Sequence, residues 1–307
     1  MSRLPLPYDR DLDPIIREEY PWQGRYLRVG ENIRMHYLDV GKGPTMLMLH
    51  GNPTWSFYYR HLVHAFSDRY RCVVPDHVGC GLSDRPSDSD YPYRLANRID
   101  DIGQLIEATD LHDITLVVHD WGGAIGMGVA QRYPDRVKRL VLLNTAAFQG
   151  PVPASIKMCM WPAWGDFVVR GLNGFVQAGL VRGFADRSHV TPAVRRGYLA
   201  PYHSWSSRIA VHRFVQDIPM DPSHPTWDLI EAIDNGLASL ADKPQLLMWG
   251  DDDFCFTPEF RKRFEAKWPD AEVHSWKDAG HFVLEEKRSE IVGLIEDFFA
   301  RHPLEAH

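Results

Sequence analysis

The sequence predicts an α/β protein with a doubly wound, mostly parallel sheet that is interrupted once by a helical insertion. Short apolar runs flanked by turn residues recur along the chain, and helical patterns lie between most of them. This alternation is typical of parallel sheets with helices on both faces. It stops after Asn144 and resumes near Trp227. A chain of 307 residues with 44% apolar content can bury such a core and still carry an inserted domain.

The strands are predicted from two kinds of pattern. Residues 26–40 alternate between polar and apolar side chains around a Gly30-Glu31-Asn32 turn, which predicts an antiparallel hairpin. After it, fully apolar runs predict buried parallel strands. These runs are residues 45–50, 72–75, 114–119, 139–144 and 245–250.

Two helices are predicted from apolar residues at helical spacing. Residues 94–108 place Leu95, Ile99 and Ile102 on one face, and residues 283–299 do the same with Leu284 and Ile291. Both faces are wide enough to pack against a sheet, so these segments are expected to cover it.

The insertion is delimited by prolines, at Gly150-Pro151-Val152-Pro153 and again at Pro219, Pro222 and Pro225. We therefore expect a core domain of residues 1–147 and 224–307 and a helical cap of residues 148–223. Most large apolar side chains of the cap are expected to pack inside it, and a few to face the core. They are Trp161, Trp164, Phe167, Leu172, Phe175, Leu180, Trp205 and Phe214.

Composition excludes several classes of protein. The net charge of -7 is spread along the chain without a run of Lys and Arg, which argues against nucleic acid as a partner. No apolar run approaches the ~20 residues of a membrane span, and residues 1–22 lack a signal-peptide pattern, so a cytoplasmic protein is expected. Isolated cysteines predict buried free thiols and neither a disulfide framework nor a metal site. They are Cys72, Cys80, Cys159 and Cys255.

The strongest chemical signal is the segment 116–123, where a buried strand runs through His119-Asp120-Trp121 into a helix that begins with two glycines. A nucleophile elbow has this form, and the glycines allow close approach to neighbouring strands. Asp120 stands where an esterase would carry Ser. A carboxylate can displace a leaving group from an sp3 carbon and form an alkyl-enzyme ester. The alternative is that Asp120 merely caps the helix.

A second signal is His50-Gly51-Asn52-Pro53, at the end of the strand expected beside the elbow. The backbone N–H groups of Asn52 and Trp121 are expected to converge on the carboxylate of Asp120 as an oxyanion hole. Their side chains carry an amide and an indole N–H, both neutral donors that suit a departing anion such as halide or carboxylate. Trp121 alone would more often be a core aromatic.

A general base and an acid are predicted near the carboxyl end of the chain. Asp278-Ala279-Gly280-His281 precedes the last helix, and the order nucleophile, acid, histidine suits this fold. His281 would activate water while an aspartate fixes its tautomer. Chemistry alone does not choose among Asp251, Asp252 and Asp253. His77 and His119 are expected to be structural.

These motifs resemble the haloalkane dehalogenases of the α/β-hydrolase superfamily, and the resemblance covers nearly the whole chain. Besides the segments above, residues 76–84 match that family. The resemblance implies an eight-stranded sheet and an inserted cap. It also implies Asp120 as nucleophile, His281 as base, Asp253 as acid, and Asn52 with Trp121 as the halide-binding pair, with no cofactor and no metal.

One branch of the family carries a Glu acid before the cap, where this chain has Asn144. The pattern therefore resembles the third subfamily, which also holds the β-lactone decarboxylases of bacterial olefin biosynthesis.

The resemblance implies a small hydrophobic substrate. The first expectation is hydrolysis of an alkyl halide to an alcohol and halide, with a halide ion held in the site. The alternative is decarboxylation of a long-chain cis-β-lactone to an alkene. A third reading is an epoxide hydrolase, which needs acidic phenols such as Tyr198 and Tyr202, although Asn52 departs from that family's pattern. A non-enzymatic binder of small hydrophobic molecules is the fourth.

Overall fold

The computed structural model describes residues 12–304 and places eight strands in one sheet. Their order is β1-β2-β4-β3-β5-β6-β7-β8, with β1, β2 and β4 paired antiparallel and all later pairs parallel. The predicted mostly parallel, eight-stranded sheet is confirmed. The strands are β1 Arg25–Val29, β2 Ile33–Val40, β3 Thr45–Leu49, β4 Arg71–Pro75, β5 Ile114–Asp120, β6 Val137–Thr145, β7 Gln245–Gly250 and β8 Glu272–Trp276.

The hairpin and all five predicted parallel strands are present within one or two residues of their expected ends. β8, which lies at the edge of the sheet, was not among the predicted strands. Its residues are only partly buried and include the polar His274 and Ser275, so it lacks the apolar run that marks the inner strands.

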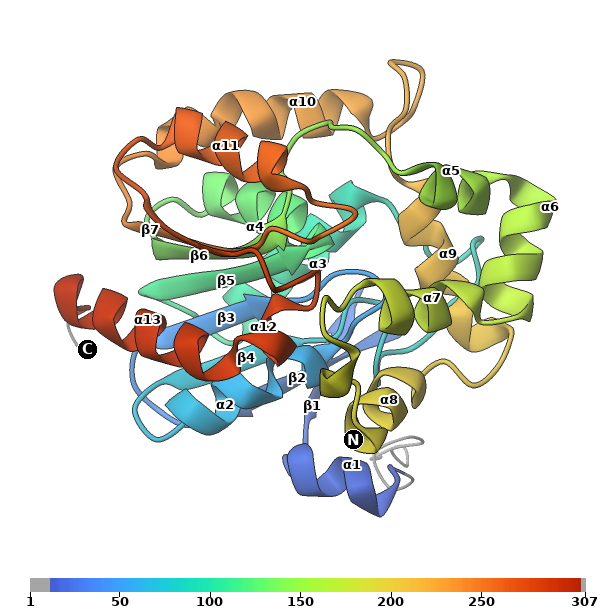
Figure 1. Cartoon of the computed structure of the whole chain (residues 1–307), viewed down its shortest axis with the longest axis horizontal. Helices are drawn as coiled ribbons and strands as arrows, with labels where there is room; N and C mark the ends of the chain where they lie inside the picture. The colour runs from blue at the N-terminus through green and yellow to red at the C-terminus, as the bar shows by residue number, and fades with distance from the viewer. Residues whose placement is uncertain (1–11, 305–307) are drawn as a thin grey trace.

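Helices cover both faces of the sheet (Figure 1). One face packs against α3 Leu95–Ala108, α4 Trp121–Arg132, α10 Trp227–Gly236 and α11 Pro258–Lys267. The other packs against η1 Ser56–Tyr59, α2 Arg60–Phe66, α12 Val283–Glu286 and α13 Arg288–Arg301. The remaining short helices of the core are α1 Pro14–Glu19 and η5 Leu237–Leu240.

The predicted single helix 283–299 is wrong in one respect, because the chain forms two helices separated at Lys287. Lys287 has φ -121° and ψ 34°, which no α-helix accommodates. The carboxylate of Glu286 accepts the backbone N–H groups of Gly280 and Asp186, at 2.7 and 2.8 Å. These contacts hold the first helix to the loop before it.

Between β6 and α10 the described chain forms helices and no strand, and we call these helices the helical insertion. They gather at one end of the sheet, to the right in Figure 1. The domain limits expected from the prolines remain a prediction. The helices are α5 Ala154–Met160, α6 Pro162–Gly165, η2 Asp166–Gly171, α7 Gly174–Arg182, η3 Arg187–His189, α8 Pro192–Leu199, η4 Ser206–Arg208 and α9 Ile209–Gln216.

The expectation that most large apolar side chains of the insertion pack inside it is wrong. Leu180 and Phe214 are buried, and Phe175 is half-buried, but the other five are between 47% and 65% exposed. Helical spacing indicates which side chains share a face but not whether a neighbour covers that face. The exposed five are Trp161, Trp164, Phe167, Leu172 and Trp205.

Within residues 12–304 no helix combines the length and the apolar character that a bilayer span requires. Three of the four free cysteines are buried as expected, whereas Cys255 is half-buried in the wall of a cavity.

Candidate active site

The elbow between β5 and α4 holds Asp120 in an unusual backbone conformation. Its φ of 53° and ψ of -127° are rarely adopted by a residue with a side chain, and such strain concentrates at functional sites. Neighbouring segments of the chain approach each other so closely at this elbow that only glycine fits at several positions. A Cβ on Gly51 would lie 2.0 Å from the Asp120 carboxylate, and one on Gly122 would lie 2.0 Å from the Leu49 carbonyl oxygen. The close approach predicted for the two glycines at the start of the helix is confirmed at Gly122 and also at Gly123, where a Cβ would lie 1.9 Å from Oγ1 of Thr145.

The carboxylate of Asp120 faces backbone donors from two loops. The backbone N–H of Asn52 donates to its Oδ1 at 2.5 Å, and the backbone N–H of Trp121 also interacts with it. Burial raises the pKa of Asp120 to about 6, although His281 and these two N–H groups favour the ionised form. The two donors occupy the positions that an oxyanion hole requires.

His281 lies between two carboxylates. Its Nδ1 is 2.9 Å from Oδ2 of Asp253, and its Nε2 is 3.8 Å from Oδ2 of Asp120. Burial lowers the pKa of His281, but the charge and hydrogen bond of Asp253 outweigh it, so the pKa is raised above the ordinary value. The three predicted side chains therefore meet at the carboxyl ends of their strands.

The structure separates the three adjacent aspartates. Asp253 is buried against His281, whereas Asp252 is exposed and Asp251 pairs with Arg261. Sequence reasoning did not give a role to Asn144, at the end of β6. Its Nδ2 donates to Oδ2 of Asp253 at 3.0 Å, and its Oδ1 accepts from Gly250 N at 2.8 Å. The signal available in the sequence was the position of Asn144 at the end of the strand that lies beside β7.

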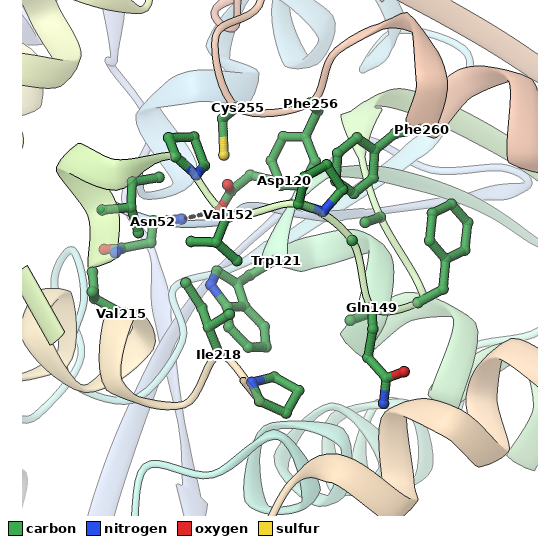
Figure 2. Close-up of a pocket in the computed structure, with 18 of the residues that line it drawn as sticks. Asn52, Asp120, Trp121, Gln149, Val152, Val215, Ile218, Cys255, Phe256 and Phe260 are labelled. Carbon is green, nitrogen blue, oxygen red and sulfur yellow. Dashed lines mark hydrogen bonds between the residues drawn. The ribbon is translucent and has the colours of Figure 1, made fainter. Parts of the chain in front are cut away.

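The side-chain donors of Asn52 and Trp121 differ in their surroundings. One N–H of the Asn52 amide donates to the Val211 carbonyl of α9 at 3.0 Å, so only part of this amide remains for an anion. Trp121 and Asp120 line the same cavity, and Figure 2 shows the Trp121 ring close to Val152 and Ile218 in this view. The two side-chain donors expected to bind an anion are therefore only partly available, because the Asn52 amide is shared with Val211.

Two apolar cavities meet at Asp120. The first, of about 120 Å³, we call the Trp121 cavity; it passes Trp121, Phe148, Ile218 and Phe260 (Figure 2). The second, of about 280 Å³, we call the His281 cavity; it passes His281 and Phe282 and reaches Met158 and Trp164. Both are bounded by Asn52, Asp120, Ile156, Phe175 and Cys255.

Tyr198 and Tyr202 do not lie in the walls of these cavities. The Tyr198 hydroxyl donates to Glu285 and the Tyr202 hydroxyl to the Thr54 carbonyl, and both side chains are buried. The suggestion that they serve as phenolic acids for epoxide opening is wrong, because neither side chain lines a cavity that contains Asp120.

His77 and His119 make buried contacts with backbone, at His50 and His281 respectively, as expected for structural histidines. Among residues 12–304 no group of three His, Cys, Asp or Glu side chains is arranged to hold a metal ion.

Comparison with known proteins identifies relatives along almost the entire chain. A family model described as alpha/beta hydrolase fold matches residues 44–288. A solved haloalkane dehalogenase from Agrobacterium tumefaciens superposes with a TM-score of 0.81 at 25% identity, covering 91% of this chain and 96% of that one.

Two characterised groups appear among the sequence relatives. The cis-3-alkyl-4-alkyloxetan-2-one decarboxylase of Shewanella oneidensis is 44% identical over 91% of this chain and 88% of its own length. The decarboxylase of the same name from Xanthomonas campestris is 43% identical over 93% and 98%. Haloalkane dehalogenase 2 of Mycobacterium tuberculosis is 33% identical over 91% and 96%. Similarity is therefore higher to the decarboxylases.

Proposed function

Because this chain belongs to the haloalkane dehalogenase-like family of α/β-hydrolases, we propose that it uses Asp120 to open a cis-β-lactone and release CO2 and an alkene. Among the expectations from sequence, hydrolysis of an alkyl halide came first and decarboxylation of a lactone second. Identities of 43–44% to two decarboxylases, against 33% to a dehalogenase, favour the reverse order.

The observation that carries this proposal is the pair of apolar cavities that meet at Asp120. A lactone with alkyl groups on adjacent ring carbons needs room for two chains that leave one reacting centre. The Trp121 and His281 cavities provide two such directions, both with mainly apolar walls. A simple alkyl halide has one chain and would use one of them.

The first step is displacement at the sp3 ring carbon that bears the ring oxygen. Asp120 forms a C–O bond to that carbon, and the ring C–O bond breaks to free a carboxylate. The indole N–H of Trp121, in the wall of the Trp121 cavity, is a neutral donor for this anion.

The second step returns the enzyme to its starting state. The bond between the freed carboxylate and the adjacent ring carbon that carries it breaks, its electron pair forms the C=C bond to the carbon esterified to Asp120, and the C–O bond to Asp120 breaks. CO2 and the alkene leave, and Asp120 is again a carboxylate. No water is consumed. His281, whose pKa is raised, is suited in its protonated form to stabilise the departing Asp120 carboxylate.

Hydrolytic dehalogenation is the second candidate, favoured by the place of Trp121 beside Asp120. There Asp120 displaces halide, and neutral His281, oriented by Asp253, directs water onto the ester. That route consumes one water and leaves one of its oxygen atoms in the Asp120 carboxylate.

The test compares two substrates on one preparation. We expect a cis-dialkyl β-lactone to give alkene and CO2 by gas chromatography and mass spectrometry, with little bromide released from 1-bromobutane or 1,2-dibromoethane. Bromide release without lactone turnover would overturn the proposal in favour of dehalogenation. Asp120→Asn is the control and should abolish either activity.

A single turnover in oxygen-18 water with excess enzyme gives an independent reading. With the lactone, the peptide that contains Asp120 should remain unlabelled, because the ester is not hydrolysed. Label in that peptide would contradict the elimination step. Under the dehalogenation candidate, His281→Gln exposed to an alkyl bromide would instead keep the alkyl group on Asp120, visible as a mass increment.

A further inference from the structure

The outer surface of the helical insertion carries a cluster of large apolar side chains that we call the aromatic patch. Its members are between 47% and 65% exposed. The rings of Trp164 and Phe167 lie 6.2 Å apart, and Phe167 and Trp205 both approach Gly171. Clusters of this kind mark surfaces that bind another body. The patch consists of Met158, Trp161, Trp164, Phe167, Leu172 and Trp205.

The helices that carry most of the patch are short and nearly free of acidic residues. From Ala154 to Leu172 the only acidic side chain is Asp166, which pairs with Arg170 and His212. Lys157 is exposed on α5 beside Met158, and Arg182 is exposed on α7. Aromatic side chains with Lys and Arg at their margin are typical of elements that lie in a membrane interface.

Charge is distributed unevenly over the chain. Residues 148–223 contain eight Lys and Arg against four Asp and Glu, whereas the whole chain has a net charge of -7. The insertion is therefore net positive and the rest strongly negative. A negatively charged surface would attract the insertion and repel the remainder, which orients the aromatic patch toward it.

The His281 cavity connects this surface with the catalytic residues. Asp120 and His281 form its inner wall, and Met158, Trp164 and Arg182 are in its wall as well. Met158 and Trp164 belong to the aromatic patch. An apolar molecule at the patch would thus have a mainly apolar path to Asp120.

We propose that the aromatic patch docks the protein on an anionic phospholipid bilayer and that apolar substrate enters the His281 cavity from that side. The docking stands on the patch and the charge distribution, while the entry of a lactone rests on the proposed function. The bound state is peripheral: rings lie at the level of the lipid headgroups and basic side chains contact lipid phosphates.

The first experiment is cosedimentation of the full chain with vesicles. We expect binding to phosphatidylcholine vesicles containing 30% phosphatidylglycerol to be at least tenfold tighter than to pure phosphatidylcholine. It should weaken as salt is raised. No binding to the anionic vesicles would overturn the proposal.

Variants locate the surface. The triple variant Trp161→Ser, Phe167→Ser, Leu172→Ser should lose at least tenfold in binding, and none of these side chains lies in either cavity wall. Met220→Ser removes an apolar side chain outside the patch that is 41% exposed and should bind within twofold of wild type. Equal binding by the triple variant would overturn the assignment of the surface.

Charge reversal tests the electrostatic part. Lys157→Glu should weaken binding to anionic vesicles several-fold and leave binding to phosphatidylcholine unchanged. Lys138→Glu, an exposed control on β6, should have no effect on either. Equal effects of the two substitutions would contradict the orientation argued from charge.

Two further measurements separate the alternatives. Sedimentation equilibrium reports self-association; a dimer that the triple variant abolishes, together with absent vesicle binding, would assign the patch to a second copy of the chain.

Turnover of a short-chain, water-soluble β-lactone should be the same in wild type and the triple variant. Vesicle binding without any lactone turnover would reject the proposed function and leave the docking intact.

Discussion

Asp120 and Glu285 are both buried carboxylates, but their partners differ. Asp120 has backbone N–H donors and an imidazole at 3.8 Å, and burial raises its pKa to about 6. Glu285 accepts two bonds from Arg60, at 2.6 and 2.9 Å, and one from Tyr198 at 2.6 Å. Burial alone would raise the pKa of Glu285, yet the Arg60 guanidinium holds it well below its usual range.

The comparison shows how a permanently charged partner changes the pKa of a buried carboxyl group. Glu285 is stabilised as an anion and joins α8 of the insertion to α2 and α12 of the core. Asp120 lacks a permanent cation, so its ionised form is costly and correspondingly reactive. We expect the first carboxylate to contribute mainly to stability and the second mainly to turnover.

The sharpest test of this contrast is Asp120→Asn. We expect turnover to fall by about 10⁴-fold or more, because the amide cannot form the ester to substrate. Glu285→Gln, assayed well below its unfolding temperature, should stay within about tenfold of wild type, since a tenfold change is only about 1.4 kcal/mol in the barrier. Steady-state rates on the lactone measure both. Comparable losses in the two variants would remove the distinction.

The next largest effect is the stability of Glu285→Gln. Removing Glu285 leaves the buried Arg60 with only the partly exposed Glu19, at 2.7 Å, so the loss in the free energy of unfolding by urea should approach the value of about 3–5 kcal/mol for a broken buried ion pair. Glu265→Gln breaks a more exposed pair with Arg261 and should cost less than about 1 kcal/mol. If Glu285→Gln lost no more stability than Glu265→Gln, the pair between Arg60 and Glu285 would add nothing to the free energy of unfolding.

Asp120→Asn should change stability in the opposite direction. The pKa of about 6 lies above the ordinary value near 3.9, so folding disfavours ionisation, and the cost at pH 7 is up to about 3 kcal/mol. Wild type should lose stability relative to the variant as pH rises from about 4 to about 6. The Glu285 contribution has the opposite sign and is lost on acidification below its unfolded pKa. Urea unfolding at several pH values detects both trends, and a pH-independent difference would contradict the first.

The smallest predicted effect is that of Tyr198→Phe. It deletes one hydrogen bond to a charged group and leaves the Arg60 pair, so about 1.5 kcal/mol of stability should be lost. Tyr133→Phe removes an exposed bond to Glu107 and provides the matched control, with a smaller expected change. An effect at Tyr198 no larger than at Tyr133 would argue against a link between α8 and the core.

The sequence predicted the inner strands and the meeting of Asp120 and His281 because local patterns report them, whereas Asp253 was chosen among three adjacent aspartates by family resemblance. Buried strands have apolar runs, and an elbow needs glycines beside the nucleophile. What it did not predict depends on distant contacts. The exposure of Trp161, the break at Lys287 and the bond between Tyr198 and Glu285 each depend on residues far away in the chain.

The insertion is fastened to the very loop that carries the imidazole. Gly183 O accepts from the backbone N–H of Phe282, Asp186 N donates to Glu286, and Tyr198 donates to Glu285. Swinging this layer outward as a rigid lid would pull His281 away from its two acids. Substrate and product molecules therefore have to pass between helices of the insertion that stay in place. Substitutions along these passages should alter the size of the accepted substrates without changing the reaction.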